Sequence, residues 1–249
     1  MGQTAELGAA IGRGKMAEVF AYGEHVAKLY EAGAPASLAF REALNLALVE
    51  SLELPAPAVR EVRRFGDRWG LVMERAEGIA FADAVQADPA QSATYLSAMV
   101  RLHQDIHAQP ALHFRQLKDR LAVNVGRAPA LGPARQRRLA EALAALPDGD
   151  RLCHGDFHPF NIIGRPGTAV VIDWLDATSG PPAADVCRTY VLIVQHLPEL
   201  ARSYVDAYAA AAGMATTQIM AWVPVVAAAR IAEDVPAELD GLLAMADGA

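Results

Sequence analysis

The hydrophobic pattern of this chain changes once, near residues 74–78, and the change limits the folds that the sequence can adopt. From about Leu7 to Glu74, short β-prone runs alternate with glycine-containing turns, a pattern typical of antiparallel hairpins. Beyond it, apolar residues recur mainly at helical intervals. The sequence therefore predicts an α+β chain, with a small antiparallel β part in residues 1–76 and a larger, mainly helical part in residues 77–249.

Two hairpins and one helix are expected in the N-terminal part. "EVFAYGEHVAKLY" places Gly23-Glu24 between two β-prone runs, and "VREVRRFGDRWGLVME" places Gly66-Asp67 in the same position. Between them, "SLAFREALNLALVESL" has helical periodicity and is stopped by "LPAP". The apolar face of this helix is expected to carry Leu38, Leu44, Leu48 and Leu52.

One polar island interrupts the helices of the C-terminal part. "SATYLSAMVRLHQDIHA" is expected to be a helix with Tyr95, Met99, Leu102 and Ile106 on its apolar face. The island, "RLCHGDFHPFNIIGRPGTAVVIDWLDA", has short β-prone runs at 162–163 and 170–172, flanked by polar loops. Helices are expected to resume at about Ala183. The polar loops of the island are the best place for a site.

Composition excludes several classes of protein. The longest apolar run, "AWVPVVAAARIA", contains Pro224 and Arg230 and is shorter than the ~20 residues that a membrane span needs. The formal net charge of −7 disfavours nucleic-acid binding. Cys153 and Cys187 lie far apart and form no C-x-x-C pair, which argues against a zinc site or a disulfide framework. We expect a soluble, cytoplasmic protein with no nucleic-acid or membrane partner; the oligomeric state is left open.

The segment "IGRGKMAEVF" has the glycines of a phosphate-binding loop. It is not a Walker A motif, because Met16 stands where that motif needs Ser or Thr. It is not a dinucleotide fingerprint either, because Ala17 replaces the third glycine and a strand pattern follows instead of a helix. Two interpretations remain: Gly12 and Gly14 belong to a kinase-type loop that covers phosphates, or to a plain hairpin turn.

"CHGDFHPFN" and "VIDW" carry the groups that phosphoryl transfer needs. Asp156 and Asn161 are five residues apart on one loop, and Asp173 follows after a strand-like run. One Asp would accept the proton of a hydroxyl group, while the Asn and the second Asp would hold magnesium on the phosphates.

The histidines of this loop allow other interpretations. His154 is expected to hydrogen-bond the loop backbone, and His158 either to brace the loop or to approach a phosphate. A zinc site formed by His154, Asp156 and His158 is the weaker interpretation, because a further His or Cys ligand is missing.

"HGDFHPFN" followed by "IDW" closely resembles the motifs of the aminoglycoside phosphotransferase and choline kinase family, which are small-molecule kinases. Further matches, "VAKLY", "FREA", "LVMERAEG", "LHQDIH" and "ATSGPPAADV", follow in the family's order. The resemblance implies a bilobal protein-kinase-like fold, with a nucleotide-binding lobe at 1–76 and a catalytic, acceptor-binding lobe at 77–249. It also implies that Asp156 is the catalytic base and that Asn161 and Asp173 bind magnesium. The missing third loop glycine is a departure from the kinase pattern.

The resemblance assigns roles to further residues. Lys28 would place its ammonium group on the α- and β-phosphates, and Glu42, preferred over Glu50, would orient it. Backbone groups of Glu74 and Ala76 would bind adenine. Asp185 resembles the family's aspartate that anchors the catalytic loop from a helix, a supporting role with no direct chemistry.

The implied reaction is transfer of the γ-phosphate of ATP, or GTP, with Mg²⁺, to a hydroxyl group of a small molecule. The acceptor would be an aminoglycoside, a choline-like amino alcohol or a related compound. A cationic acceptor could dock on acidic residues of the C-terminal helices, although any solvated helix carries such residues: Glu199, Asp206, Glu233 and Asp234. The alternatives are a catalytically silent nucleotide-binding module and a protein kinase; "HGD" in place of H-R-D disfavours the latter.

Overall fold

The computed structural model describes residues 6–248, and these divide into two compact units. The sheet unit comprises the described part of Met1–Ala84 together with Phe160–Asp176. The helical unit comprises Val85–Pro159 together with the described part of Ala177–Ala249.

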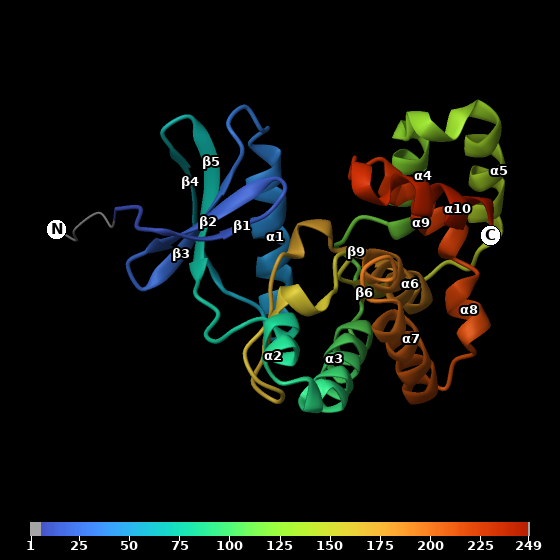
Figure 1. The fold of residues 1–249 in the computed structure, drawn as a ribbon. Helices are drawn as coiled ribbons and strands as arrows, with labels where there is room; N and C mark the ends of the chain where they lie inside the picture. The colour runs from blue at the N-terminus through green and yellow to red at the C-terminus, as the bar shows by residue number, and fades with distance from the viewer. Residues whose placement is uncertain (1–5, 249) are drawn as a thin grey trace. The chain divides into compact units, whose positions relative to one another are not determined.

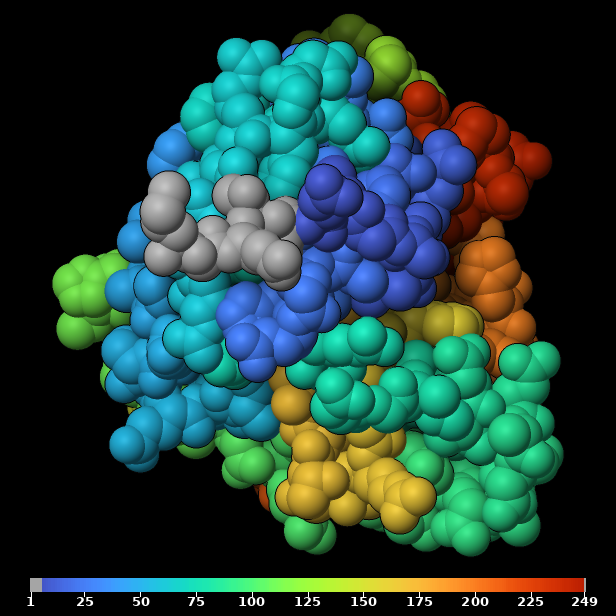
Figure 2. Space-filling model, turned by 90° about the vertical axis from the view of Figure 1, so that its left-hand side faces the viewer, coloured from blue at the N-terminus to red at the C-terminus, as the bar shows by residue number. Residues whose placement is uncertain are grey.

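The sheet unit contains a five-stranded sheet in the order β1-β2-β3-β5-β4. Its strands are β1 (Ala10–Arg13), β2 (Ala17–Tyr22), β3 (His25–Tyr30), β4 (Val59–Phe65) and β5 (Arg68–Glu74). Every neighbouring pair is antiparallel, and Figure 2 shows the blue β1–β3 segment beside the cyan β4–β5 segment. Both predicted hairpins are confirmed: Gly23 and Gly66 begin the two tight turns with φ of 61° and 64°. Such positive φ values suit glycine, which has no Cβ to clash with the backbone.

The predicted single helix is α1 (Ser37–Ser51), which lies beside the sheet in Figure 1. Its predicted face is only partly right. Leu38 is buried, but Leu44 is 58% exposed, and the buried side is made of Leu38, Ala39, Glu42, Asn45, Leu46 and Val49. The inward stripe includes Glu42 and Asn45 because both side chains find hydrogen-bond partners inside the unit, which offsets the cost of burying them.

Residues 160–176 pack into the sheet unit, although they are far from it in the sequence. They include the last two residues of η3 (Pro159–Asn161), and they form β7 (Ile162–Ile163), β8 (Val170–Val171) and η4 (Trp174–Asp176). The Val171 N–H group donates to the Pro55 carbonyl at 2.8 Å, and Asn45 Nδ2 donates to the Trp174 carbonyl at 2.8 Å. The boundary between the two compact units therefore does not fall at Ala76. It depends on long-range hydrogen bonds, which local sequence patterns do not predict. The 76/77 boundary between functional lobes stays a prediction.

The helical unit surrounds a short two-stranded ladder, β6 (Arg151–Cys153) with β9 (Thr178–Gly180). Its helices include α3 (Ser92–His107), α4 (Leu117–Arg127), α5 (Gly132–Ala145), α6 (Pro182–Ile193), α7 (Pro198–Ala212), α8 (Thr216–Met220), α9 (Val223–Ile231) and α10 (Leu239–Asp247). Helix α2 (Phe81–Ala87) spans the division between the units. None of the helices within residues 6–248 is long and apolar enough to cross a membrane.

The buried face of α3 differs from the predicted one. Met99 and Ile106 are buried as expected, while Tyr95 and Leu102 are only half-buried. The face also contains His103 and His107, which lie one helical turn apart and are buried. The predicted apolar helix face is therefore partly polar, and one of its polar side chains, His103, stacks on Phe157 of the loop that follows β6.

Candidate active site

Three charged side chains meet in the sheet unit. Lys28 projects from β3, Glu42 from α1 and Asp173 from the turn between β8 and η4. Lys28 Nζ lies 2.7 Å from Glu42 Oε1 and 2.8 Å from Asp173 Oδ1. The ion pair expected between Lys28 and Glu42 is therefore present, and Glu42, not Glu50, makes it. The contribution of these residues to phosphate binding stays a prediction.

Burial and charge act in opposite directions on this cluster. The side chains of Lys28 and Glu42 are 10% and 1% exposed. Burial lowers the pKa of Lys28, but the carboxylates of Glu42 and Asp173 outweigh burial and hold that pKa above its usual range. Burial raises the pKa of Glu42, against the influence of Lys28. The result is a lysine that stays charged at neutral pH and is held by two carboxylates from different elements.

Asn161 and Asp173, the two predicted magnesium ligands, are neighbours in the sheet unit. Ile162 pairs with Val171 in the β7–β8 ladder, and the Ile172 N–H group donates to the Asn161 carbonyl at 2.9 Å. Each predicted ligand is therefore at the same end of this short ladder. Trp174 Nε1 donates to the Val171 carbonyl at 2.8 Å, which fixes the turn that contains Asp173.

The predicted nucleotide loop and hinge lie in the sheet unit. Strands β1 and β2 are antiparallel, and the Gly14 N–H group donates to the Ala17 carbonyl at 2.9 Å, so the segment containing Gly12 and Gly14 is a hairpin. At the hinge, the Glu74 N–H group already donates to the Ala58 carbonyl at 2.9 Å. The adenine-binding prediction for Glu74 therefore rests on its carbonyl group, while that for Ala76 is unchanged.

Asp156, the predicted base, lies in the helical unit on the loop that follows β6. Its side chain is 26% exposed, with Oδ2 at 3.5 Å from His158 Nε2 and Oδ1 at 3.8 Å from an Arg188 Nη atom. Burial raises the pKa of Asp156, but His158 and Arg188 outweigh burial and hold it below its usual range. The carboxylate is thus ionised at neutral pH, the form that accepts a proton.

Asp185 and His154 hold this loop as predicted. The N–H groups of His154 and Gly155 donate to the Asp185 carboxylate at 2.6 and 2.9 Å. The Asp156 N–H group donates to His154 Nδ1 at 3.1 Å. Gly155 has φ of 81°, a conformation that glycine adopts without strain. A helix side chain and a histidine therefore fix the backbone on both sides of Gly155.

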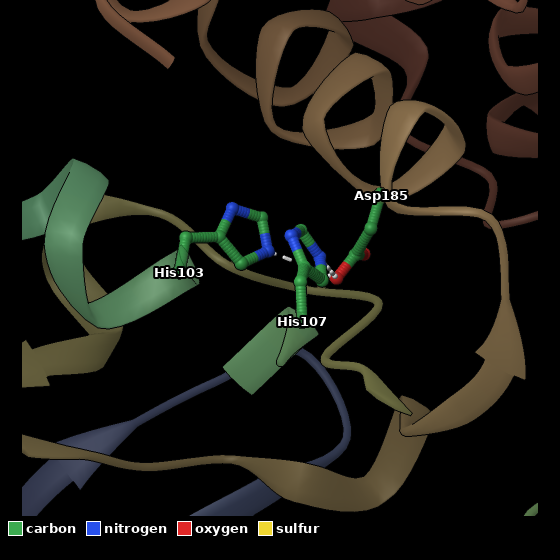
Figure 3. A group of neighbouring side chains, drawn as sticks. All are labelled: His103, His107 and Asp185. Atoms are coloured by element: carbon green, nitrogen blue, oxygen red, sulfur yellow. Dashed lines mark hydrogen bonds and ion pairs between the residues drawn. The ribbon is translucent and has the colours of Figure 1, made fainter. Parts of the chain in front are cut away.

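A histidine and tyrosine network behind Asp185 is absent from the sequence-based predictions. His103 Nε2 and His107 Nε2 lie 2.9 and 3.2 Å from Asp185 Oδ2, and Figure 3 shows both rings reaching from α3 toward α6. His107 Nδ1 contacts the Tyr208 hydroxyl at 2.6 Å, and His103 Nδ1 contacts the Tyr204 hydroxyl. The signal available in the sequence was the pair of histidines four residues apart in "LHQDIH".

The same three side chains have the types and spacing of metal ligands. Hydrogen bonding accounts for them better. Burial lowers the pKa of His103 to about 3, so this ring is neutral. A neutral ring that donates from Nε2 to Asp185 accepts from a tyrosine hydroxyl at Nδ1, and both histidines have this pair of partners. We therefore describe the cluster as a hydrogen-bond network.

Glu233, considered above for a cationic acceptor, is already engaged with cations. Arg188 lies 2.7 Å from Glu233 Oε1, and Arg230 contacts Glu233 Oε2. Burial raises the pKa of Glu233, but these arginines outweigh burial and lower it. Arg188 Nε also donates to the Gly155 carbonyl at 3.2 Å, so Arg188 braces the loop that carries Asp156. The sequence-based reasoning did not select Arg188.

Comparison with known proteins gives a family match over most of the chain. The model of a family described as the phosphotransferase enzyme family matches residues 18–222. A search of curated proteins found no match.

Solved structures of aminoglycoside phosphotransferases have the same fold. A thermostable mutant of APH(4)-Ia, in a ternary complex with ADP and hygromycin B, matches with a TM-score of 0.71 and 13% identity, over 98% of this chain and 91% of that chain. Aminoglycoside-3'-phosphotransferase of type VIII matches with a TM-score of 0.67 and 20% identity, over 92% of this chain and 93% of that chain. APH(3'')-Id from Streptomyces rimosus, in complex with ADP and streptomycin, matches with a TM-score of 0.63 and 19% identity, over 90% of this chain and 94% of that chain. The predicted α+β, protein-kinase-like fold is thereby confirmed.

Proposed function

The chain belongs to the phosphotransferase enzyme family, and from this premise we propose that it transfers the γ-phosphate of ATP or GTP to a hydroxyl group of a small molecule. The observation that carries the proposal is the placement of Lys28 between Glu42 and Asp173. Kinase-type phosphoryl transfer requires an ion pair between a strand lysine and a helix glutamate, together with an aspartate that holds magnesium, and Asp173 is proposed for the latter role.

In this proposal Asp156 acts on the acceptor. Its ionised carboxylate accepts the proton of the acceptor hydroxyl while the hydroxyl oxygen bonds to the γ-phosphorus and the bond to the β-phosphate oxygen breaks. The products are a phosphate ester and a nucleoside diphosphate. Asp185 and His154 keep the base in place through the loop backbone.

Lys28 places its positive charge on the α- and β-phosphates, and Glu42 orients it. The loop containing Gly12 and Gly14 covers the phosphates, and backbone groups of Glu74 and Ala76 bind the base of the nucleotide. The division at Ala76 then separates the nucleotide-binding residues from the catalytic and acceptor-binding residues. The buried, free thiols of Cys153 and Cys187 suit the reducing cytoplasm that we propose as the location of the enzyme.

Asn161 and Asp173 suit magnesium. Both offer hard oxygen atoms, they lie at the same end of the β7–β8 ladder, and the Asp173 side chain is 40% exposed. When bound, magnesium neutralises the charge that develops on the phosphate oxygens. Lys28 donates to Asp173 Oδ1, and the neighbouring ladder fixes the backbone of Asn161.

The acceptor is proposed as an aminoglycoside, a choline-like amino alcohol or a related small alcohol. Two of the solved neighbours carry ADP together with an aminoglycoside, hygromycin B or streptomycin. A cationic acceptor would have to use acidic groups other than Glu233, whose charge Arg188 and Arg230 balance.

A thermal-shift panel tests the proposal. The chain is heated with Mg-ATP or Mg-GTP, each alone and with aminoglycosides, choline, ethanolamine, thiamine and macrolides. We expect the melting midpoint to rise with one nucleotide in a magnesium-dependent way and to rise further with one acceptor class. Release of nucleoside diphosphate by the chain is then measured with an acceptor of that class. Absence of a magnesium-dependent nucleotide shift at millimolar concentration would contradict the proposed nucleotide-dependent transfer.

A further inference from the structure

Tyr30 contacts the same carboxylate that holds Lys28. Lys28 and Tyr30 are two residues apart on β3, so their side chains point to the same face of the sheet. Glu42, from α1, lies between them: Oε1 accepts from Lys28 Nζ at 2.7 Å, and Oε2 accepts from the Tyr30 hydroxyl. Each oxygen of this buried carboxylate therefore has its own donor.

The backbone around Tyr30 is fixed independently of Glu42. Tyr30 pairs with Ala17 in the β2–β3 ladder. Its carbonyl accepts from Arg68 Nε at 2.7 Å, and Arg68 also donates to the Leu29 carbonyl at 2.8 Å. The Tyr30 residue is 1% exposed. Because the strand and Arg68 fix Tyr30, this side chain can set the orientation of Glu42.

Glu42 needs a second donor because it is fully buried. A buried carboxylate oxygen without a hydrogen-bond partner costs more free energy than the bond itself contributes. Burial raises the pKa of Glu42, and the other charges that act on this cluster are Lys28, Asp173 and Arg41. The Tyr30 hydroxyl supplies the second donor and adds no charge, because burial raises the pKa of the phenol above its usual range.

We infer that Tyr30 is a positioning residue, which fixes Glu42 and through it holds Lys28 in the orientation that binds nucleotide phosphates. The inference rests on the proposed function and extends it by one residue. Without the hydroxyl, Glu42 Oε2 has lost its donor, and the carboxylate rotates or takes up a proton. Lys28 is then drawn toward Asp173, 2.8 Å away on its other side, instead of toward the phosphates.

The test is a double-mutant cycle on the full chain with Tyr30→Phe, Glu42→Gln and both together. The dissociation constant for Mg-ATP is measured by titration calorimetry, and KM for nucleotide and for acceptor is measured with the acceptor found by the panel. We expect Tyr30→Phe to weaken nucleotide binding about tenfold, the order expected for one hydrogen bond to a charged group, and to leave KM for the acceptor unchanged. In the Glu42→Gln background, Tyr30→Phe should have almost no further effect.

Tyr22→Phe is the matched control. Tyr22 lies on the adjacent strand β2, and its hydroxyl contacts Arg63 at 3.3 Å. This variant removes the same atom from the same sheet and should bind nucleotide like the unmodified chain.

Several results would overturn the inference. One is equal nucleotide affinity in Tyr30→Phe and in the unmodified chain. Another is an equal loss of nucleotide affinity on Tyr30→Phe whether residue 42 is Glu or Gln. The third is a Tyr30→Phe chain that no longer folds, which would make the role of Tyr30 structural. If the unmodified chain binds neither Mg-ATP nor Mg-GTP, the proposed function fails, and the inference fails with it. Binding by the unmodified chain with no loss in Tyr30→Phe overturns the inference alone.

Discussion

Asp173 shows at the level of one residue how this fold holds a proposed metal ligand. It is a non-glycine residue with φ of 64°, a conformation that costs about 1–3 kcal/mol at a functional site. Asn45 holds the next residue through the Trp174 carbonyl, and the indole N–H of Trp174 donates to Val171. The strained turn directs the carboxylate toward Lys28, and the hydrogen bonds on its C-terminal side maintain it.

Replacing Asp173 by alanine should abolish magnesium-dependent nucleotide binding. A lost metal ligand should cost at least about 100-fold in affinity, because loss of a group that only supports a ligand already costs 10- to 100-fold. Calorimetric titration of nucleotide with magnesium, and again with a chelator, measures the effect. Asp83→Ala, an exposed aspartate on α2, is the control. Unchanged affinity in Asp173→Ala would remove this residue from the metal site.

At the level of single residues, the sequence motifs were the source of the candidate site residues, whose roles stay predictions. The spacing of "HGDFHPFN" and "IDW" selected Asp156, Asn161 and Asp173, and the structure then placed Asn161 beside the Asp173 turn. Tyr30 was missed because its hydroxyl acts on a side chain twelve residues away, across a strand and a helix. Alternation along β3 was the one signal in the sequence that placed Tyr30 on the same face as Lys28.

At the level of elements, the loop containing Asp156 depends on contacts between α3, α6 and α7. Asp185 on α6 accepts from two loop N–H groups and from His103 and His107 on α3, and the tyrosines behind those histidines come from α7. Because the network is buried, each member must stay in one protonation state for the others to stay bonded. This requirement predicts a dependence of stability on pH.

His103 should make the free energy of unfolding fall as pH decreases below 6.5. The folded chain keeps His103 neutral down to a pKa of about 3, whereas the unfolded chain binds the proton near its ordinary value of 6.5. The unfolded state therefore binds more protons in this range, and acid favours it, by roughly a few kcal/mol in total. Urea unfolding at pH values from 7.5 to 5 measures the slope.

His103→Gln should flatten that slope, and His113→Gln, at an exposed histidine, should not. An equal slope in His103→Gln and the unmodified chain would show that another group causes the pH dependence.

If the His103, His107 and Asp185 cluster is a hydrogen-bond network, metal removal should not affect it. We expect the melting midpoint to be the same before and after dialysis against a strong chelator, because hydrogen bonds already join both histidine rings to Asp185. Elemental analysis of the purified chain should show no stoichiometric zinc. A midpoint that falls after chelation and recovers on adding zinc would contradict this description and favour a structural metal site.

Element types were predictable, but the buried faces of the helices were less so. Glycine turns located both hairpins, because turn chemistry is local. The faces of α1 and α3 were misjudged because apolar periodicity ignores polar residues that have partners inside. Glu42 and Asn45 on α1, and His103 and His107 on α3, are buried for their hydrogen bonds.

For the whole molecule, the switch from β-prone hairpins to helices near residue 76 was enough to predict the fold class. It was not enough to place residues 160–176, whose hydrogen bonds to Pro55 and Asn45 join them to the sheet unit. The chain therefore crosses from one compact unit to the other between Pro159 and Phe160, within the motif that contains Asp156 and Asn161. Local sequence patterns predict turns and the faces of helices, whereas the point at which the chain passes from one compact unit to the other depends on long-range contacts.

In the proposed reaction, Asp156 accepts the proton of an acceptor alcohol during a nucleotide-dependent transfer. The test is Asp156→Asn, with turnover and Mg-nucleotide affinity measured on the same preparation, and the control is Asp119→Asn, at an exposed aspartate on α4. We predict that turnover falls by about 10²- to 10⁴-fold, the usual contribution of a positioned base, while nucleotide affinity stays nearly unchanged. Turnover in Asp156→Asn close to that of the unmodified chain would show that Asp156 is not the base.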